Sequence, residues 1–200
     1  MKKALLLLLL PGMLQASEVY FSPRGHIQEQ ILKRIHRSSS TLDLAMYSLT
    51  SHEIAEALVD AGRRGVKVRI IRDISQTKEK SDADPLLQGQ NVEVRLLKGL
   101  GRGIMHDKFA VFDGREGFTG SYNWTENAEL DNYENAFFFT DPQILAAYEK
   151  QFTHLWDIAQ PLAMSGQTPS AIPGLFRDHP ALSAFGLFVI LLALAAALST

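Results

Sequence analysis

The chain contains no cysteine among its 200 residues. Disulfide bonds and thiolate metal sites are therefore excluded, because both need the cysteine sulfur. The six histidines form neither an H-x-H pair nor an H-E-x-x-H motif, and no cluster of carboxylates in the sequence suggests a two-metal centre. We therefore expect a protein that works without a bound metal or other cofactor.

The net charge is small, but the charges are unevenly distributed. Residues 24–108 hold 15 Lys and Arg against 11 Asp and Glu, whereas residues 109–200 hold 3 against 10. A basic excess attracts polyanions such as nucleic acids, although any single cation of this kind is more often a solvated surface group.

Both ends of the chain are apolar, for different reasons. Two lysines before the apolar run 4–10, with small residues at Ala16 and Ser17, are typical of a secretory signal, which we place at residues 1–16. Residues 181–198 carry no charge and would reach about 27 Å as a helix, enough for a membrane span. A buried core helix is the alternative. Prolines and glycines in residues 161–180 instead predict a linker, so we interpret residues 181–198 as a C-terminal transmembrane anchor. Together with the signal, this anchor predicts an exported protein on the periplasmic or cell-envelope side.

Residues 17–160 alternate between strand-like and helix-like patterns, and Thr50 with Glu53 matches a capping box. The patterns predict strands near residues 19–21, 42–48, 66–70, 92–96, 104–112 and 134–139, and helices near 26–37, 50–64 and 142–155. Strands that alternate with helices predict an α/β domain with a mixed β-sheet flanked by helices. The apolar C-terminal helix would follow beyond the linker.

The string H-x-K-x4-D-x6-G-S-x-N begins at His106. On a strand, His106 and Lys108 would point to the same face, because they are two residues apart. An imidazole can act as nucleophile or acid, and a lysine ammonium can hold a phosphate oxygen. Ser121 and Asn123 add neutral hydrogen-bond donors. The string therefore suits the cleavage of a phosphodiester bond, with Asp113 bonding to the backbone of a turn.

This string resembles the HKD signature of the phospholipase D superfamily. The resemblance extends to residues 20–23, 45–50, 64–69, 123–125 and 132–135. Because the chain holds one such string, it most resembles the small bacterial endonucleases of the Nuc type. The mitochondrial cardiolipin-hydrolase branch is the next most similar. The resemblance implies a phospholipase D-like catalytic domain over residues 17–160.

The resemblance also implies roles for individual residues. His106 would form a phosphohistidine, and Glu134 would be the carboxylate that orients the histidine. A second imidazole must protonate the leaving oxygen, because one ring cannot attack and donate at once. The superfamily brings two HKD strings together for this purpose. A chain with one string is therefore expected to form a homodimer with a shared active site.

Two activities follow as hypotheses from these residues. The first is a metal-independent endonuclease that acts on nucleic acid, foremost DNA. The alternative is hydrolysis of phospholipids such as cardiolipin, which a C-terminal membrane anchor favours. A phosphate-binding protein without catalysis would have lost a signature residue, and none is lost. The expected partners are nucleic acid, a second copy of the chain, and a membrane through the C-terminal helix.

Overall fold

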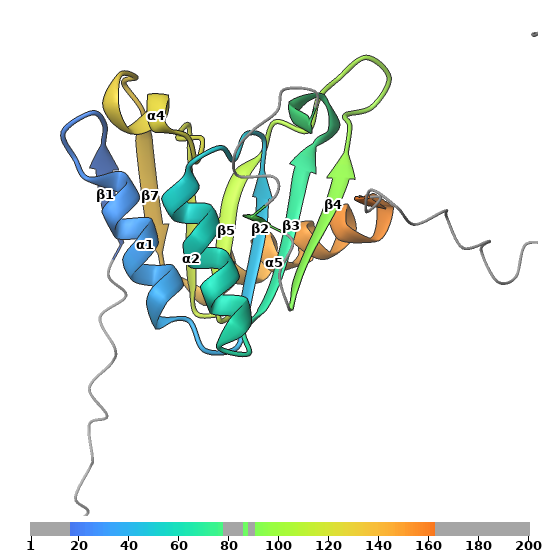
Figure 1. Cartoon of the computed structure of the whole chain (residues 1–200), viewed down its shortest axis with the longest axis horizontal. Helices are drawn as coiled ribbons and strands as arrows, with labels where there is room; N and C mark the ends of the chain where they lie inside the picture. The colour runs from blue at the N-terminus through green and yellow to red at the C-terminus, as the bar shows by residue number, and fades with distance from the viewer. Residues whose placement is uncertain (1–16, 78–85, 88–90, 163–200) are drawn as a thin grey trace, which may run out of the picture. The chain divides into compact units, whose positions relative to one another are not determined.

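The computed structural model describes residues 17–77, 86–87 and 91–162 (Figure 1). The elements follow in the order β1 (Glu18–Phe21), α1 (Ile27–Arg37), β2 (Thr41–Met46), α2 (His52–Arg63), β3 (Lys67–Asp73), the 3-10 turn η1 (Ile74–Thr77), β4 (Val92–Leu97), β5 (Lys108–Phe112), β6 (Glu116–Gly120), α4 (Glu126–Leu130), β7 (Asn135–Phe139), α5 (Pro142–Ile158) and β8 (Gln160–Pro161). The predicted signal and C-terminal helix lie outside the described residues. Within those residues, no helix is long and apolar enough to cross a membrane.

The described strands form one eight-stranded mixed sheet in the order β1-β7-β6-β5-β2-β3-β4-β8. Strands β2, β3 and β4 pair in parallel, and all other neighbours are antiparallel. Helices α1 and α2 cover one face, and α5 covers the other (Figure 1). The predicted α/β domain with a mixed sheet between helices is confirmed.

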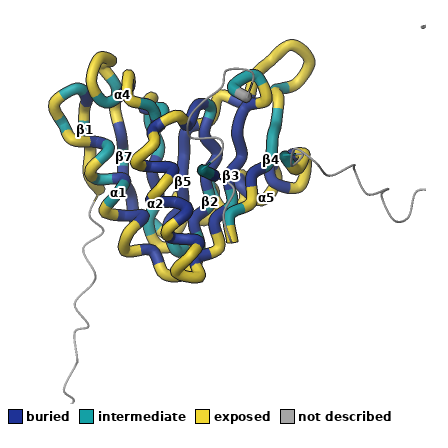
Figure 2. The backbone as a smooth tube through the Cα atoms, in the orientation of Figure 1, coloured by how far each residue is buried: buried dark blue, intermediate teal, exposed yellow. Residues whose placement is uncertain are grey.

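Each face of the sheet buries its own apolar core. Figure 2 shows that most of the strand residues are buried. On α1, Ile27, Ile31 and Ile35 recur every four residues and are fully buried against the sheet. This spacing puts them on one side of the helix. On the opposite face, Phe152 and Trp156 of α5 pack in the same way, with their rings stacked at 5.6 Å.

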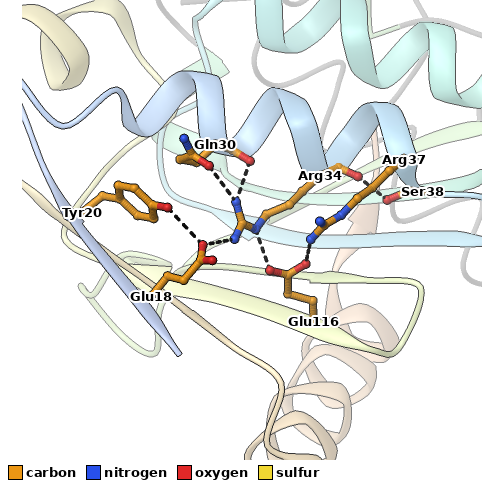
Figure 3. Close-up of polar contacts among 7 residues, drawn as sticks. All are labelled: Glu18, Tyr20, Gln30, Arg34, Arg37, Ser38 and Glu116. Atoms are coloured by element: carbon orange, nitrogen blue, oxygen red, sulfur yellow. Dashed lines mark hydrogen bonds and ion pairs between the residues drawn. The ribbon is translucent and has the colours of Figure 1, made fainter. Parts of the chain in front are cut away.

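A buried arginine joins α1 to strands β1 and β6 (Figure 3). Arg34 is 4% exposed; its Nε donates to Glu116 and its Nη2 to Glu18, each at 2.7 Å. The guanidinium also lies 3.6 Å above the ring centroid of Phe138. The hydrogen bond from Arg34 lowers the pKa of the Glu18 carboxyl. Because the charge is paired on both sides, it can remain buried under the helix.

The start of α2 corrects the sequence prediction by one residue. Ser51, and not Thr50, is the N-cap, and its hydroxyl accepts a hydrogen bond from the Ile54 N–H at 3.4 Å. Glu53 therefore occupies the second helical position, from which it cannot complete a capping box. It accepts a hydrogen bond from the Gln28 side chain instead.

Two strand boundaries also differ from the prediction. β5 begins at Lys108 rather than at residue 104, so His106 precedes the strand. β2 ends at Met46 rather than at residue 48. Before β5, the Met105 N–H donates to the carboxylate of Asp73 at 2.7 Å instead of to a neighbouring strand. At the C-terminal boundary, Pro161 was predicted to open the linker, yet it pairs with Arg95 in β8.

Candidate active site

Four strands bring the predicted chemical groups to one edge of the sheet. β5 is antiparallel to both β2 and β6, and β7 is antiparallel to β6. The carboxyl ends of β2 and β6 therefore meet the amino ends of β5 and β7. This places Tyr47, His106, Lys108, Ser121 and Glu134 at a common edge.

Tyr47 is a residue of this site that the sequence analysis did not single out. Its ring lies 4.7 Å, between centroids, from the imidazole of His106, with the planes at 62°. The same ring centroid is 5.0 Å from the Lys108 Nζ. The Tyr47 N–H donates to the Asp107 carbonyl at 2.8 Å, and its hydroxyl accepts from Gln76 at 3.0 Å. The sequence pointed to Tyr47 only through the segment 45–50, which is part of the resemblance to the phospholipase D superfamily.

The Lys108 ammonium is held within hydrogen-bonding distance of the His106 backbone. Its Nζ donates to the His106 carbonyl oxygen at 3.1 Å, and the residue is 8% exposed. Burial lowers the pKa of the Lys108 ammonium, while the charges of Glu134 and Asp107 oppose this effect. The pKa of Asp107 is raised by desolvation, against the opposing effects of Lys108 and His106. A partly desolvated cation next to an exposed imidazole is suited to hold a phosphate.

Glu134 contacts Ser121 rather than the histidine. The Ser121 hydroxyl donates to one carboxylate oxygen, and the Asn132 side chain donates to the other at 3.1 Å. Within the described ranges, no hydrogen bond joins Glu134 to His106. The carboxylate therefore acts in this geometry on Ser121 and, through its charge, on Lys108.

A close approach between β6 and β7 requires glycine at position 120. A Cβ atom on Gly120 would lie 2.1 Å from the Asn135 carbonyl oxygen. The N–H groups of Ser121 and Tyr122 both point to that oxygen, at 3.2 and 3.3 Å. The side-chain oxygen of Asn123 is buried and has no hydrogen-bond partner among the described residues. The Gly-Ser-x-Asn turn is therefore held tightly against β7.

Tyr122 connects this turn to the helical layer. It is fully buried, and its hydroxyl donates to Glu129 at 2.9 Å. The same carboxylate oxygen accepts from the N–H of Gln28, in the first turn of α1, at 3.0 Å. Through Glu129, the turn is thus linked to α1, a helix that is distant in sequence.

Asp113 lies at the opposite end of β5 from His106. Its carboxylate accepts hydrogen bonds from the N–H groups of Ser39, Ser40 and Thr41 at 2.8–3.2 Å. Burial raises the pKa of this carboxyl, but the backbone donors outweigh it and lower the pKa to about 2. Asp113 therefore holds the start of β2 and takes no part in the site.

A shallow groove of about 550 Å³ opens beside His106. One wall comes from the segment after β4, including Leu100 and Ile104, and the other from α5, including His154 and Ile158. His154 is therefore a second imidazole on the same groove. Among the described residues, no three His, Asp or Glu side chains are grouped closely enough to hold a metal ion.

Several of the arginines that contribute to the basic excess of residues 24–108 lie within the domain structure, away from the site. Arg69 pairs with Asp43 through two hydrogen bonds of 2.7 Å, and Arg63 pairs with Asp60. Arg72 is 2% exposed. These three arginines therefore serve the packing and ion pairing of the domain, whereas Lys98, which is exposed, lines the groove beside His106.

Comparisons with known proteins identify the family of the chain. Residues 31–156 match the family described as cardiolipin synthase, PLD-like domain. The chain belongs to the phospholipase D superfamily, whose hydrolases act on phosphodiester bonds. The resemblance drawn from the HKD string is thereby confirmed.

Individual relatives refine the comparison. The chain is 33% identical over 149 residues to the mitochondrial cardiolipin hydrolase of Chlamydomonas reinhardtii, covering 74% of this chain and 66% of that protein. The crystal structure of Nuc from Salmonella typhimurium, a phospholipase D family member, has a TM-score of 0.68 and 25% identity, covering 75% of this chain and 99% of Nuc. NucT from Helicobacter pylori has a TM-score of 0.70 and 27% identity, covering 74% and 99%.

Proposed function

We propose that this protein is a metal-independent phosphodiesterase that cleaves nucleic acid, foremost DNA. The observation that carries the proposal is the extent of the likeness to Nuc and NucT, of which the chain covers 99% each. The sequence resemblance links the Nuc type to small endonucleases with one HKD string. By contrast, the chain spans 66% of the length of the Chlamydomonas cardiolipin hydrolase.

In the proposed reaction, a ring nitrogen of His106 attacks the phosphorus atom. A P–N bond forms as the P–O bond to the leaving oxygen breaks, and water later cleaves the phosphohistidine. The Lys108 ammonium stabilises the charge on the non-bridging oxygens. Asn123 and the Ser121 hydroxyl supply further donors, and Ser121 would have to turn from Glu134 toward the phosphate.

The leaving oxygen needs a proton from a second imidazole. We propose that His106 of the partner subunit supplies it across a two-fold axis, so that two chains share one site. His154 is the alternative within one chain, because it lines the same groove as His106. His52 lies away from this groove and is 3.6 Å from Glu56.

Hydrolysis of phospholipid is the second candidate function. Two observations favour it: the similarity to a cardiolipin hydrolase and the apolar walls of the groove beside His106. The same phosphohistidine chemistry would serve either substrate. The proposed export and C-terminal anchoring, which rest on residues 1–16 and 181–198, would also place the site near a lipid surface.

One assay separates these functions. The full-length protein, in mild detergent with excess EDTA, is incubated with plasmid DNA, single-stranded DNA, RNA and cardiolipin vesicles. We expect nucleic acid to be cut, and the His106→Asn variant to lose at least about 10³-fold in rate while its circular dichroism is unchanged. Release of phosphatidic acid without nucleic acid cleavage would establish the second candidate. Activity that vanishes with EDTA and returns with Mg²⁺ would reject the metal-independent mechanism.

A further inference from the structure

A segment beside the candidate site exposes apolar side chains between cations. Residues 98–104, called here the 98–104 loop, join the end of β4 to the residues before His106 and project beyond the sheet at the upper right of Figure 1. Leu100 is 96% exposed and Ile104 is 48% exposed. The exposed cations Lys98 and Arg102 alternate with them along the loop.

The glycines of the loop give it a defined shape. A Cβ atom on Gly99 would lie 2.5 Å from the backbone of Gly103 and Ile104, so the two sides of the loop touch at its base. Gly101 has φ +61°, a left-handed conformation that favours glycine. The Gly103 N–H closes the turn on the Leu100 carbonyl oxygen at 2.9 Å. Leu100 is therefore held outward instead of packing on the domain.

The loop is continuous with the groove of the candidate site. Leu100 and Ile104 form part of one wall, and the half-exposed Ile158 of α5 stands on the other. Lys98, His106 and His154 are the basic residues of the lining, and Asp107 is its one carboxylate. The apolar surface thus extends from the loop to the side of His106.

We propose that the 98–104 loop docks on an anionic phospholipid bilayer. Leu100 and Ile104 would enter the boundary between headgroups and acyl chains, while Lys98 and Arg102 would meet lipid phosphates. Alternation of large apolar side chains with cations suits such a surface, because the apolar side chains contact acyl chains while the cations contact the phosphates that lie nearer to water. Nucleic acid would contact the cations but would leave Leu100 without an apolar partner. This docking does not depend on which phosphodiester the site cleaves.

The absence of native cysteine makes a direct test possible. Leu100→Cys, in the full-length chain carrying His106→Asn, is labelled with the environment-sensitive fluorophore NBD. The matched control is Arg115→Cys, in the exposed turn at the opposite end of β5. Each protein is mixed with vesicles of phosphatidylcholine alone, or of phosphatidylcholine with phosphatidylglycerol. Lipid-borne quenchers then report contact between the fluorophore and the bilayer.

We expect a blue shift and lipid quenching at position 100 with the anionic vesicles only, and neither at position 115. The response should be lost in 1 M salt, where the Debye length falls to about 3 Å, and in the Lys98→Gln/Arg102→Gln background. No response at position 100, or the same response with both vesicle types, would overturn the proposal. A blue shift caused by DNA would also overturn it. So would a shift that depends on protein concentration without vesicles, because this would place a second copy of the chain on the loop. Because His106 is replaced, the result is independent of the proposed hydrolysis.

Discussion

The phenol ring of Tyr47 packs edge to face against the imidazole of His106, with 4.7 Å between the ring centroids. The contact joins the end of β2 to the segment before β5. Since the same ring is 5.0 Å from the Lys108 ammonium, Tyr47 supports both groups of the HKD string from one side. The exposed histidine thus has a defined neighbour on the domain, although it lies outside any strand.

Tyr47→Phe should retain this support and keep kcat/KM within about twofold of wild type. Tyr47→Ala should lower kcat/KM on the order of 10²-fold, because it frees the imidazole and removes a cation–π contact. Steady-state kinetics of both variants, with thermal melts as the folding control, make the comparison. If Tyr47→Phe is as damaging as Tyr47→Ala, the hydroxyl contact to Gln76 is the important one, and Gln76→Leu should then reproduce the loss.

The pH dependence of the reaction should report the Lys108 ammonium. Burial holds its pKa below the ordinary value, and the charge of Glu134 raises it. Activity that needs protonated Lys108 therefore falls as pH rises through this lowered pKa. Glu134→Gln removes the raising effect, so the alkaline limb of kcat/KM should move to still lower pH, whatever the change in absolute rate.

Asp107→Asn is the matched control for this shift, because Asp107 also raises the pKa of Lys108. It should move the alkaline limb in the same direction and by a smaller amount. An alkaline limb that stays in place in Glu134→Gln would show that Lys108 does not set it.

The origin of the second imidazole can be tested by mixing subunits. Wild-type and His106→Asn chains are combined in varying ratios under conditions of full exchange. If two copies of His106 share one phosphate, a mixed pair lacks one of the two imidazoles, and activity should fall as the square of the wild-type fraction. His154→Gln should remain active in this case. A linear fall, together with an inactive His154→Gln variant, would instead assign the acid to His154 of the same chain.

Asp113 should affect stability and not catalysis. Its folded pKa of about 2 lies below the ordinary 3.8, so the ionised carboxylate stabilises the fold above about pH 4 and this contribution is lost as pH falls toward 2. Asp113→Asn, which tolerates the positive φ of 52°, should lower the free energy of unfolding at pH 7 by about 1–2 kcal/mol, allowing for solvent screening.

Urea unfolding of both proteins at pH 7 and near pH 2 checks this prediction. The difference in free energy of unfolding should shrink at the lower pH, while kcat at neutral pH stays close to wild type because Asp113 is at the far end of β5. A gap that does not change with pH would mean that the charge of Asp113 is unimportant.

The chemistry of the site was readable from the sequence because its residues form a compact string. His106, Lys108, Ser121 and Asn123 lie within 18 positions, and their types alone indicate phosphate chemistry. The α/β class followed from apolar spacing, since periods of two and 3.6 residues are local properties of the chain. Helix α5, predicted near residues 142–155 and observed at Pro142–Ile158, is an example in which apolar spacing agreed with the structure.

Tertiary structure alone decided which of these residues touch. The order of β2, β5, β6 and β7 in the sheet brings Tyr47 to His106 and Ser121 to Glu134, and no local pattern encodes those contacts. The first residue of β5 depended on where its neighbour β2 stops, so the predicted strand through His106 was wrong. Spacing along one segment determines its own conformation, whereas strand order and register, set by packing of the whole domain, determine which distant side chains meet.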